Sequence, residues 1–273
     1  MTAPIGAAAR IARLRRSMSE LDLTALNSLD RLRLLTTNHV QRLHLATGSP
    51  ATRSRRTRAL LRRLTDRGLV VRLPRDIGGH RAGSATSTFC LTRLGQAVLT
   101  APEVPPRRRM LWQTKPYFQD HMLAVAELYV GLVEACRDKN AELLAFEAEP
   151  TCWRRFSGPG GETLILKPDA VVRVGTGDFE LASFIEVDLG TESLPTIHRK
   201  CQVYLRYWRS GQEQRDHGVF PRVWWLVHDL ARLKAIVRVV GRLPSDAQPL
   251  FAIALTEEAA DQLVQLPAPG DTA

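Results

Sequence analysis

Three carboxylates are spaced so that they could bind a metal ion. Glu186 and Asp188 lie two residues apart in Phe184–Asp188, which we expect to be a strand, so both side chains project from one face. Asp169 lies within the preceding predicted strand, which pairing would bring alongside. Such oxygens suit Mg²⁺ or Mn²⁺, and the ion could activate water for phosphodiester cleavage. Structural alternatives are a turn at Asp169, which follows Pro168, and a solvent-facing Glu186/Asp188 pair.

A run of arginines near residue 60 indicates phosphate binding. On the helix that we expect over about 52–67, the residues of one face are Thr57, Leu60, Leu61 and Leu64. Arg55, Arg58 and Arg62 fall on the opposite, outward face, where arginines can neutralise phosphates and read guanine in the major groove of DNA. The residues that we expect to contact double-stranded DNA are Arg53, Arg55, Arg58, Arg62, Arg72, Arg75 and Arg81.

Three other interpretations of this arginine face stay open. It could be a solvated surface, it could bind RNA, or it could belong to a winged-helix domain that binds only proteins. A solvated surface usually balances its charges, yet only Asp66 offers Arg62 an acidic partner one turn away. The pattern therefore favours DNA binding.

The elements around these arginines have the order of a winged helix-turn-helix. Periodicity and turn residues predict helices over 26–35, 38–45 and 52–67, a strand over 69–73, a glycine-rich loop over 75–87, a strand over 88–91 and a helix over 92–99. We expect residues 1–20 to be a disordered basic arm and residues 21–100 to be the DNA-binding domain.

The carboxylates belong to a second domain that follows a linker. Residues 101–116 contain prolines and three consecutive arginines, which is typical of a semi-rigid linker. Beyond it we expect helices over 119–137, 193–210 and 231–240 and strands over 143–147, 163–174, 179–187, 222–227 and 250–255. This order predicts an α/β domain with a mixed central sheet over 117–256, with a C-terminal tail over 257–273. The chain as a whole is expected to be a multidomain α+β protein.

The charge of the chain follows the same division. The 273 residues carry a formal charge of +10. Residues 1–110 hold 21 arginines and 6 acidic residues, a net charge of +15, whereas residues 111–273 hold 17 basic and 22 acidic residues, a net charge of −5. Such an asymmetry indicates two domains with different tasks.

Several protein classes are excluded by the sequence. Glu127 and Glu134 interrupt the most apolar run, Met122–Cys136, so we expect neither a membrane-spanning helix nor a membrane partner. No apolar segment follows the basic N-terminus as it would in a secretory signal. The four cysteines form no CxxC pair, which argues against a zinc ribbon and a disulfide framework and favours a cytoplasmic protein.

The carboxylate segments resemble a nuclease motif. Pro168-Asp169 and Glu186-Val187-Asp188 are similar to the motif of the PD-(D/E)xK nuclease superfamily, which has the restriction-endonuclease-like fold. The predicted order of helices and strands agrees with the core of that fold. The resemblance therefore implies that the second domain is restriction-endonuclease-like.

One position departs from the motif, because Asp188 stands where the superfamily pattern has its lysine. Lys200, on the following predicted helix, is the candidate for a lysine that has moved to a nearby element, and Lys167 is a second candidate. Without such a lysine, metal or DNA binding without cleavage is the alternative. The resemblance implies that the catalytic residues are Asp169, Glu186, Asp188 and Lys200, and that the first three bind Mg²⁺ or Mn²⁺.

The whole chain resembles the replication-relaxation family over about residues 25–255. The segments that carry this resemblance are the arginine-rich winged helix, the linker, Asp120-His-Met-Leu123, Lys167-Pro-Asp169, Glu186–Ser193 and Lys200-Cys-Gln-Val-Tyr204. Such proteins occur on plasmids and integrative elements of Gram-positive, especially actinobacterial, hosts. The resemblance implies a role in plasmid replication and DNA relaxation, with replication or transfer proteins as partners.

Two functions from different classes follow. The first is a DNA-binding protein of a mobile element that nicks DNA with a metal ion. The second is a non-catalytic replication accessory or transcriptional regulator, whose second domain dimerises the chain or recruits partners. We do not expect a tyrosine-type relaxase, because the sequence has no metal-binding His-x-His pair.

Overall fold

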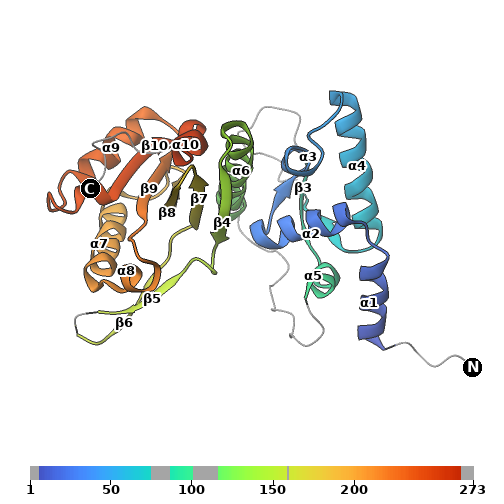
Figure 1. Ribbon diagram of the computed structural model, residues 1–273, viewed down its shortest axis with the longest axis horizontal. Coiled ribbons are helices and arrows are strands. Elements are labelled where there is room, and N and C mark those ends of the chain that lie inside the picture. The colour runs from blue at the N-terminus through green and yellow to red at the C-terminus, as the bar shows by residue number, and fades with distance from the viewer. Residues whose placement is uncertain (1–5, 75–86, 101–115, 159, 266–273) are drawn as a thin grey trace, which may run out of the picture. The chain divides into compact units, whose positions relative to one another are not determined.

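The computed structural model describes residues 6–74, 87–100, 116–158 and 160–265. It shows an α+β protein whose chain divides into two compact units, residues 1–126 and 127–273 (Figure 1). The division falls within helix α6 (Pro116–Lys139), whereas the sequence predicted a boundary in the linker over 101–116. None of the helices in the described ranges is long and apolar enough to span a membrane.

The first unit combines helices with a small antiparallel sheet. Its helices are α1 (Ala7–Arg16), α2 (Glu20–Leu32), α3 (Thr37–His44), α4 (Pro50–Asp66) and α5 (Arg93–Leu99). Its strands β1 (Leu35–Thr36), β2 (Val70–Arg72) and β3 (Thr88–Leu91) lie in the order β1-β3-β2. Val71 faces Cys90 in the β2–β3 pair. The order of three helices (α2 to α4), strand, strand and helix was predicted, but α2 spans residues 20–32 and not 26–35, and Leu35 lies in β1, a strand that the sequence did not predict.

Capping side chains fix the beginnings of these helices. The Ser19 hydroxyl accepts a hydrogen bond from the Asp22 N–H (3.2 Å), and the Asp22 carboxylate accepts one from the Ser19 N–H (3.1 Å). The two residues thus form a capping box at the start of α2. Ser49 caps α4, and Pro50 follows in the first turn, where its missing N–H loses no helical hydrogen bond.

Helix α1 corrects the expectation that residues 1–20 form a disordered basic arm. Residues 7–16 are helical, and α1 packs against α5. Alanine, arginine and leucine, which dominate this segment, are strong helix formers. Ile11 and Ala12 are half-buried, so the helix also has a face that contacts the rest of the unit.

A mixed five-stranded sheet forms the centre of the second unit. Its strands are β4 (Glu142–Ala148), β7 (Ala170–Thr176), β8 (Phe179–Asp188), β9 (Arg222–Val227) and β10 (Phe251–Leu255), in the order β10-β9-β8-β7-β4. Strands β8, β9 and β10 are parallel, and β7 pairs antiparallel with both β8 and β4. The predicted mixed central sheet is confirmed.

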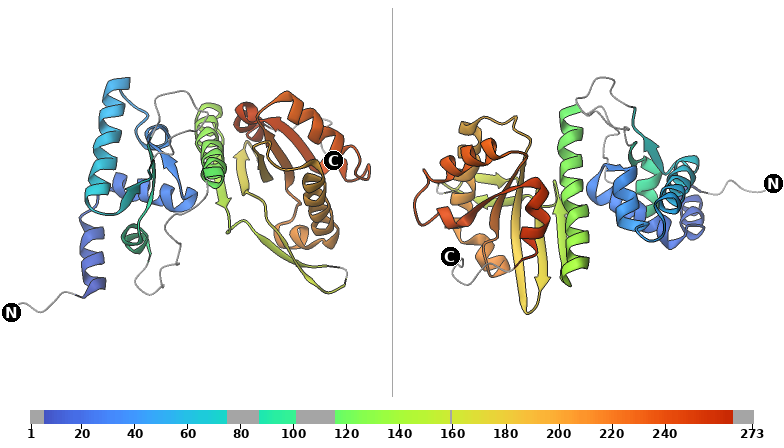
Figure 2. Two further views of the ribbon diagram at one scale, coloured as in Figure 1. Left: turned by 180° about the vertical axis from the view of Figure 1, so that it is seen from behind. Right: turned by 90° about the horizontal axis from the view of Figure 1, so that it is seen from above.

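Helices cover both faces of this sheet (Figure 2). On one face α7 (Leu194–Ser210) and α9 (Leu230–Val240) pack against each other and bury Phe184, Tyr204 and Trp225 beneath them. On the other face α6 approaches α10 (Thr256–Leu263) where Gly131 meets Ala260. The remaining elements are α8 (Gln212–His217) and a short 3₁₀ helix, η1 (Gln248–Leu250).

Two expectations for this unit were wrong. The predicted strand over 163–174 is two strands, β6 (Thr163–Leu166) and β7, and β6 pairs instead with β5 (Arg154–Ser157) in a separate hairpin. Pro168 separates β6 from β7, because proline has no N–H to donate to a strand partner. The expected C-terminal tail over 257–273 begins with most of α10, whose Ala259 and Leu263 are buried.

Candidate functional site

Helix α4 presents an arginine face to solvent. Thr57, Leu60, Leu61 and Leu64 are buried against the first unit. Arg55, Arg58 and Arg62 are exposed, as the helical spacing predicted. The assignment of buried and exposed faces is therefore confirmed for this helix.

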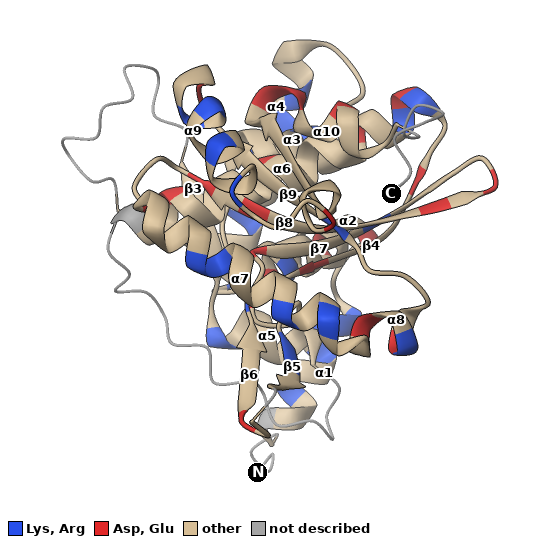
Figure 3. Cartoon of the chain, turned by 90° about the vertical axis from the view of Figure 1, so that its left-hand side faces the viewer, with Lys and Arg blue, Asp and Glu red and all other residues tan. Residues whose placement is uncertain are grey.

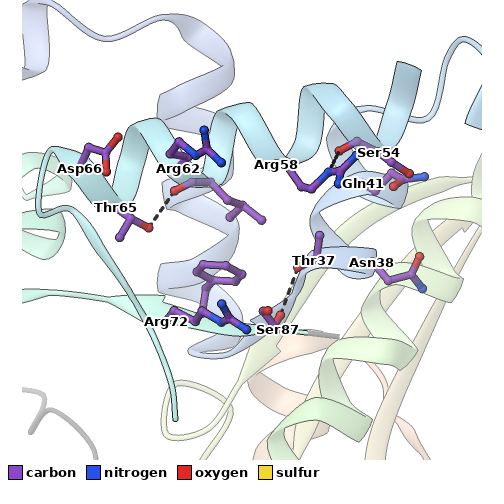
Figure 4. A pocket seen from close by; sticks show the side chains of 12 residues that line it. Thr37, Asn38, Gln41, Ser54, Arg58, Arg62, Thr65, Asp66, Arg72 and Ser87 are labelled. Carbon is purple, nitrogen blue, oxygen red and sulfur yellow. Dashed lines mark hydrogen bonds between the residues drawn. The ribbon is translucent and has the colours of Figure 1, made fainter. Parts of the chain in front are cut away.

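Two of these arginines line a groove of about 700 Å³ between α3, α4 and the sheet (Figure 4). Arg58 and Arg62 enter it from α4 and Arg72 enters it from β2. Asn38 and Gln41 line it from α3. Guanidinium groups and side-chain amides are the groups with which proteins bind phosphates and base edges.

No acidic side chain of the described residues forms an ion pair with the arginines of the groove. Within the described parts of the chain, Arg58, Arg62 and Arg72 form no ion pair, and Arg58 Nε donates only to the Ser54 carbonyl (3.2 Å). Asp66, the acidic residue one turn from Arg62, also lines the groove but forms no ion pair with it. The arginines are thus available to an anionic ligand.

Other members of the predicted DNA-binding set lie elsewhere. Arg53 is half-buried, and its Nη1 donates to the Ala46 carbonyl (3.3 Å), so it holds the segment before α4 rather than facing the groove. Arg55 is exposed on α4 but does not line the groove. Arg75 and Arg81 lie outside the described residues.

A second site lies where β8 passes under α7, and Glu186 is at its centre. Only 1% of this residue is exposed. Its Oε2 accepts a hydrogen bond from Lys200 Nζ (3.0 Å) and its Oε1 accepts one from the Tyr204 hydroxyl (2.7 Å). Lys200 Nζ also lies 2.9 Å from Glu192 Oε1. The lysine therefore bridges a buried carboxylate and a half-buried one.

Burial and charge shift the pKa values of this cluster. Burial raises the pKa of Glu186 to about 7, although the Lys200 ammonium acts to lower it, and the charge of Asp169 raises it further. Burial alone would lower the pKa of Lys200, but Glu186, Asp169 and Glu192 together raise it above its ordinary value. Burial and the neighbouring Glu186 raise the pKa of Tyr204. The hydroxyl therefore stays protonated and donates to Glu186.

Asp169 lies close to this cluster from the segment between β6 and β7. It is 8% exposed, and its Oδ2 accepts a hydrogen bond from the Val187 N–H (2.7 Å). Its N–H donates to the Ile185 carbonyl (2.9 Å). The sequence placed Asp169 within a strand; the structure places it before the first residue of β7.

Asp188 has different partners from those predicted. It projects from the same face of β8 as Glu186, but it forms an ion pair with Arg232 of α9 and accepts a hydrogen bond from the Gly190 N–H (2.9 Å). Arg232 Nη2 also donates to the Glu192 carbonyl (2.6 Å). Asp188 is thus held by an arginine and a loop N–H.

The described residues contain no group of three His, Cys, Asp or Glu side chains arranged to hold a metal ion. The structure brings together Asp169, Glu186 and Lys200 of the predicted catalytic set, and pairs Asp188 with Arg232. The ion pair between Lys200 and Glu192 was not predicted from the sequence. The spacing of Lys200 and Tyr204, four residues apart on one helix face, was the signal that both reach the same carboxylate.

Comparison with known protein families identifies a match. The family model described as replication-relaxation matches residues 26–223, which include both the arginine groove and the Glu186 cluster. No curated protein and no solved structure matches the chain significantly.

Proposed function

The chain belongs to the replication-relaxation family, and we propose that it serves there as a double-stranded-DNA-binding protein of a plasmid or other mobile element. Family membership implies a role in replication and relaxation. DNA is the ligand class that such a role requires, and the first unit offers a surface suited to it.

The observation that carries this proposal is the uncompensated arginine groove. Arg58, Arg62 and Arg72 converge from two elements on one groove and have no acidic partner in the described residues. The order α2, α3, α4 followed by β2 and β3 is that of a winged helix, in which α4 would be the recognition helix. Such a helix enters the major groove and its side chains reach base edges and phosphates.

A single substitution on α4 with a matched control tests this proposal. Arg58→Ala should weaken binding to duplex DNA about tenfold, because one phosphate or guanine contact is worth roughly 1–3 kcal/mol. Arg56→Ala, two residues away, removes the same charge from an exposed residue that does not line the groove. Fluorescence anisotropy with a labelled duplex measures both. Equal losses in the two variants, or no binding by the wild type, would contradict the proposal.

Metal-dependent nicking of DNA is the second candidate function, and the grouping of Asp169, Glu186 and Lys200 favours it. Two carboxylates and a lysine are the residue types of the nuclease motif, and here Lys200 comes from the helix after it. Asp188 is held by Arg232 and by the Gly190 N–H, and not by Lys200, the cation of this group. Asp169 and Glu186 would therefore be the residues that hold Mg²⁺ or Mn²⁺, which would supply an activated water and stabilise charge on the phosphate.

Plasmid nicking tests this second function. With Mg²⁺ or Mn²⁺ the wild type should convert supercoiled plasmid to open circles, and Glu186→Gln should lower the rate at least a hundredfold by removing a charged ligand. Glu180→Gln, at an exposed position of the same strand, is the control and should nick like the wild type. If the wild type yields no metal-dependent product, the non-catalytic accessory or regulator is the better description.

A further inference from the structure

The second unit has a basic face, although residues 111–273 carry a net charge of −5. Helices α7 and α9, of 17 and 11 residues, contain no Asp or Glu. Their Lys and Arg residues are Arg199, Lys200, Arg206, Arg209, Arg232, Lys234 and Arg238. By contrast α10 contains Glu257, Glu258 and Asp261 and no basic residue. Figure 3 shows Lys and Arg repeated along α7.

Three arginines of α7 form a row on its exposed side. Arg199, Arg206 and Arg209 are separated by seven and three residues, spacings that return to one helix face, and all three are exposed. The row extends over about 15 Å, at 1.5 Å per residue. On its opposite side α7 is anchored by buried Ile197, Tyr204 and Leu205, so the row stands on a rigid element.

No acidic side chain of the described residues pairs with this row. Within the described residues, neither Arg199, Arg206 nor Arg209 forms an ion pair, and the hydrogen bonds of Arg199 and Arg206 go to Thr196 and to the Gln202 carbonyl. Some exposed cations of the same unit have acidic partners, as in the pairs Lys139–Asp261 and Arg173–Glu180, whereas others, such as Arg215 and Arg242, form no ion pair with the described residues. A row of unpaired arginines on a regular helix is complementary to a regular array of negative charges.

We propose that the α7 arginine row (Arg199, Arg206 and Arg209) is a second DNA-contacting surface, which binds the phosphate backbone. The proposal rests on the proposed DNA-binding function and extends it to the second unit. A duplex presents phosphates all along its length, and arginine binds them through charge and paired N–H donors. A membrane surface fits less well, because a helix that lies on a membrane inserts its apolar face, and that face of α7 is buried in the core.

One end of the row lies next to the Glu186 cluster in sequence. Lys200 follows Arg199 directly, and the Lys200 side chain is 34% exposed, whereas Glu186 beneath it is buried. Successive residues lie about 100° apart around a helix, so Lys200 lies off the row and points towards Glu186.

The salt dependence of binding by the full chain tests the row. Arg206→Gln with Arg209→Gln should lower the slope of log K against log salt by about 2, since each phosphate contact contributes about 0.9, on a duplex several helical turns long. The control, Lys139→Gln with Arg173→Gln, removes two cations that already have acidic partners and should leave the slope unchanged. Arg206→Lys with Arg209→Lys keeps the charge and should keep the slope.

The outcomes separate this proposal from the proposed function. If Arg58→Ala weakens binding but the α7 double variant matches the wild type, the row is not a DNA surface and the α4 groove stands. If the α7 variant has a lower slope of log K against log salt while Arg58→Ala binds normally, the α7 arginine row contacts DNA and the α4 groove does not. Equal losses in the α7 variant and its control would overturn the row, because only net charge would then matter. A wild type that binds no DNA overturns both.

Discussion

At the scale of residues, the state of the Glu186 side chain depends on its neighbours Lys200 and Tyr204. A buried carboxylate without a partner would be strongly destabilising, and here Lys200 and Tyr204 each satisfy one of its oxygens. The same contacts serve either function. They could hold a cluster that binds a metal ion, or stabilise the packing of α7 on β8.

Removing one partner of the Lys200–Glu186 pair should destabilise the protein more than removing both partners. Lys200→Met leaves a buried carboxylate without its ammonium partner. We expect the free energy of unfolding to fall by about 2–3 kcal/mol. This is at or below the lower end of the range for buried pairs, because Lys200 is partly exposed. Adding Glu186→Gln should restore most of that loss. Urea unfolding of both variants measures the difference, and a double variant less stable than Lys200→Met would refute it.

A second carboxylate, Asp22, should make the stability of the first unit depend on pH. Burial opposes ionisation of Asp22, but hydrogen bonds from Arg63 and from the Ser19 N–H outweigh it and lower the pKa of Asp22 below its ordinary value of 3.8. A lowered folded-state pKa gives stability that is complete above the unfolded pKa and is lost as pH falls through the folded pKa.

Asp22→Asn should therefore destabilise the protein by about 1–3 kcal/mol at pH 7, because it removes a buried charge partner of Arg63 and weakens a helix cap. The difference from the wild type should shrink as the pH falls below 3.8. Chemical denaturation at pH 7 and at acid pH measures this. A difference of the same size at both pH values would show that the charge of Asp22 does not contribute.

At the scale of elements, patterns of neighbouring residues predicted the features that neighbouring residues determine, which are the helices and their exposed faces. Apolar periodicity and turn residues predicted α3 and α4 within a few residues, and the spacing of apolar residues predicted which face of α4 is exposed. The β5–β6 hairpin was missed, because the apolar run from Thr163 through Val174 looks continuous and only Pro168 interrupts it. Helix α1 was missed because its apolar residues, mostly alanine, show little periodicity.

Tertiary partners explain what the sequence could not predict about the candidate site. Spacing on one strand predicted that Glu186 and Asp188 share a face. It could not predict that Arg232, 44 residues further along the chain, takes Asp188 as its partner. That pairing depends on how α9 packs beside α7, which no local pattern specifies.

The packing of α5 onto the small sheet gives a prediction for this scale. A Cβ added at Gly95 would lie 2.2 Å from the Leu69 carbonyl oxygen, a backbone atom that cannot move aside without disturbing the sheet. Gly95→Ala should thus destabilise the first unit by about 3 kcal/mol, despite the higher helix propensity of alanine. At Gly175 the added Cβ meets only ordinary contacts with Leu144, so Gly175→Ala is the control. Equal thermal midpoints for the two variants would argue against the close α5 contact.

At the scale of the whole molecule, charge is distributed more finely than the division between the two halves suggests. The basic N-terminal half has its uncompensated arginines in one groove, and the acidic C-terminal half has an acid-free helical layer with its own arginine row. A chain that binds DNA with one unit alone would have no need of the second surface. The distribution is consistent with both units contacting the same polyanion.

The measurement that tests the central claim most directly is the salt dependence of duplex binding by a variant of the α4 arginine face. Arg58→Ala and Arg62→Ala together should lower the slope of log K against log salt by about 2, at about 0.9 per lost phosphate contact, and weaken binding most at low salt. A slope and an affinity unchanged from the wild type would contradict the account, because the arginine face of α4 would then not contact DNA.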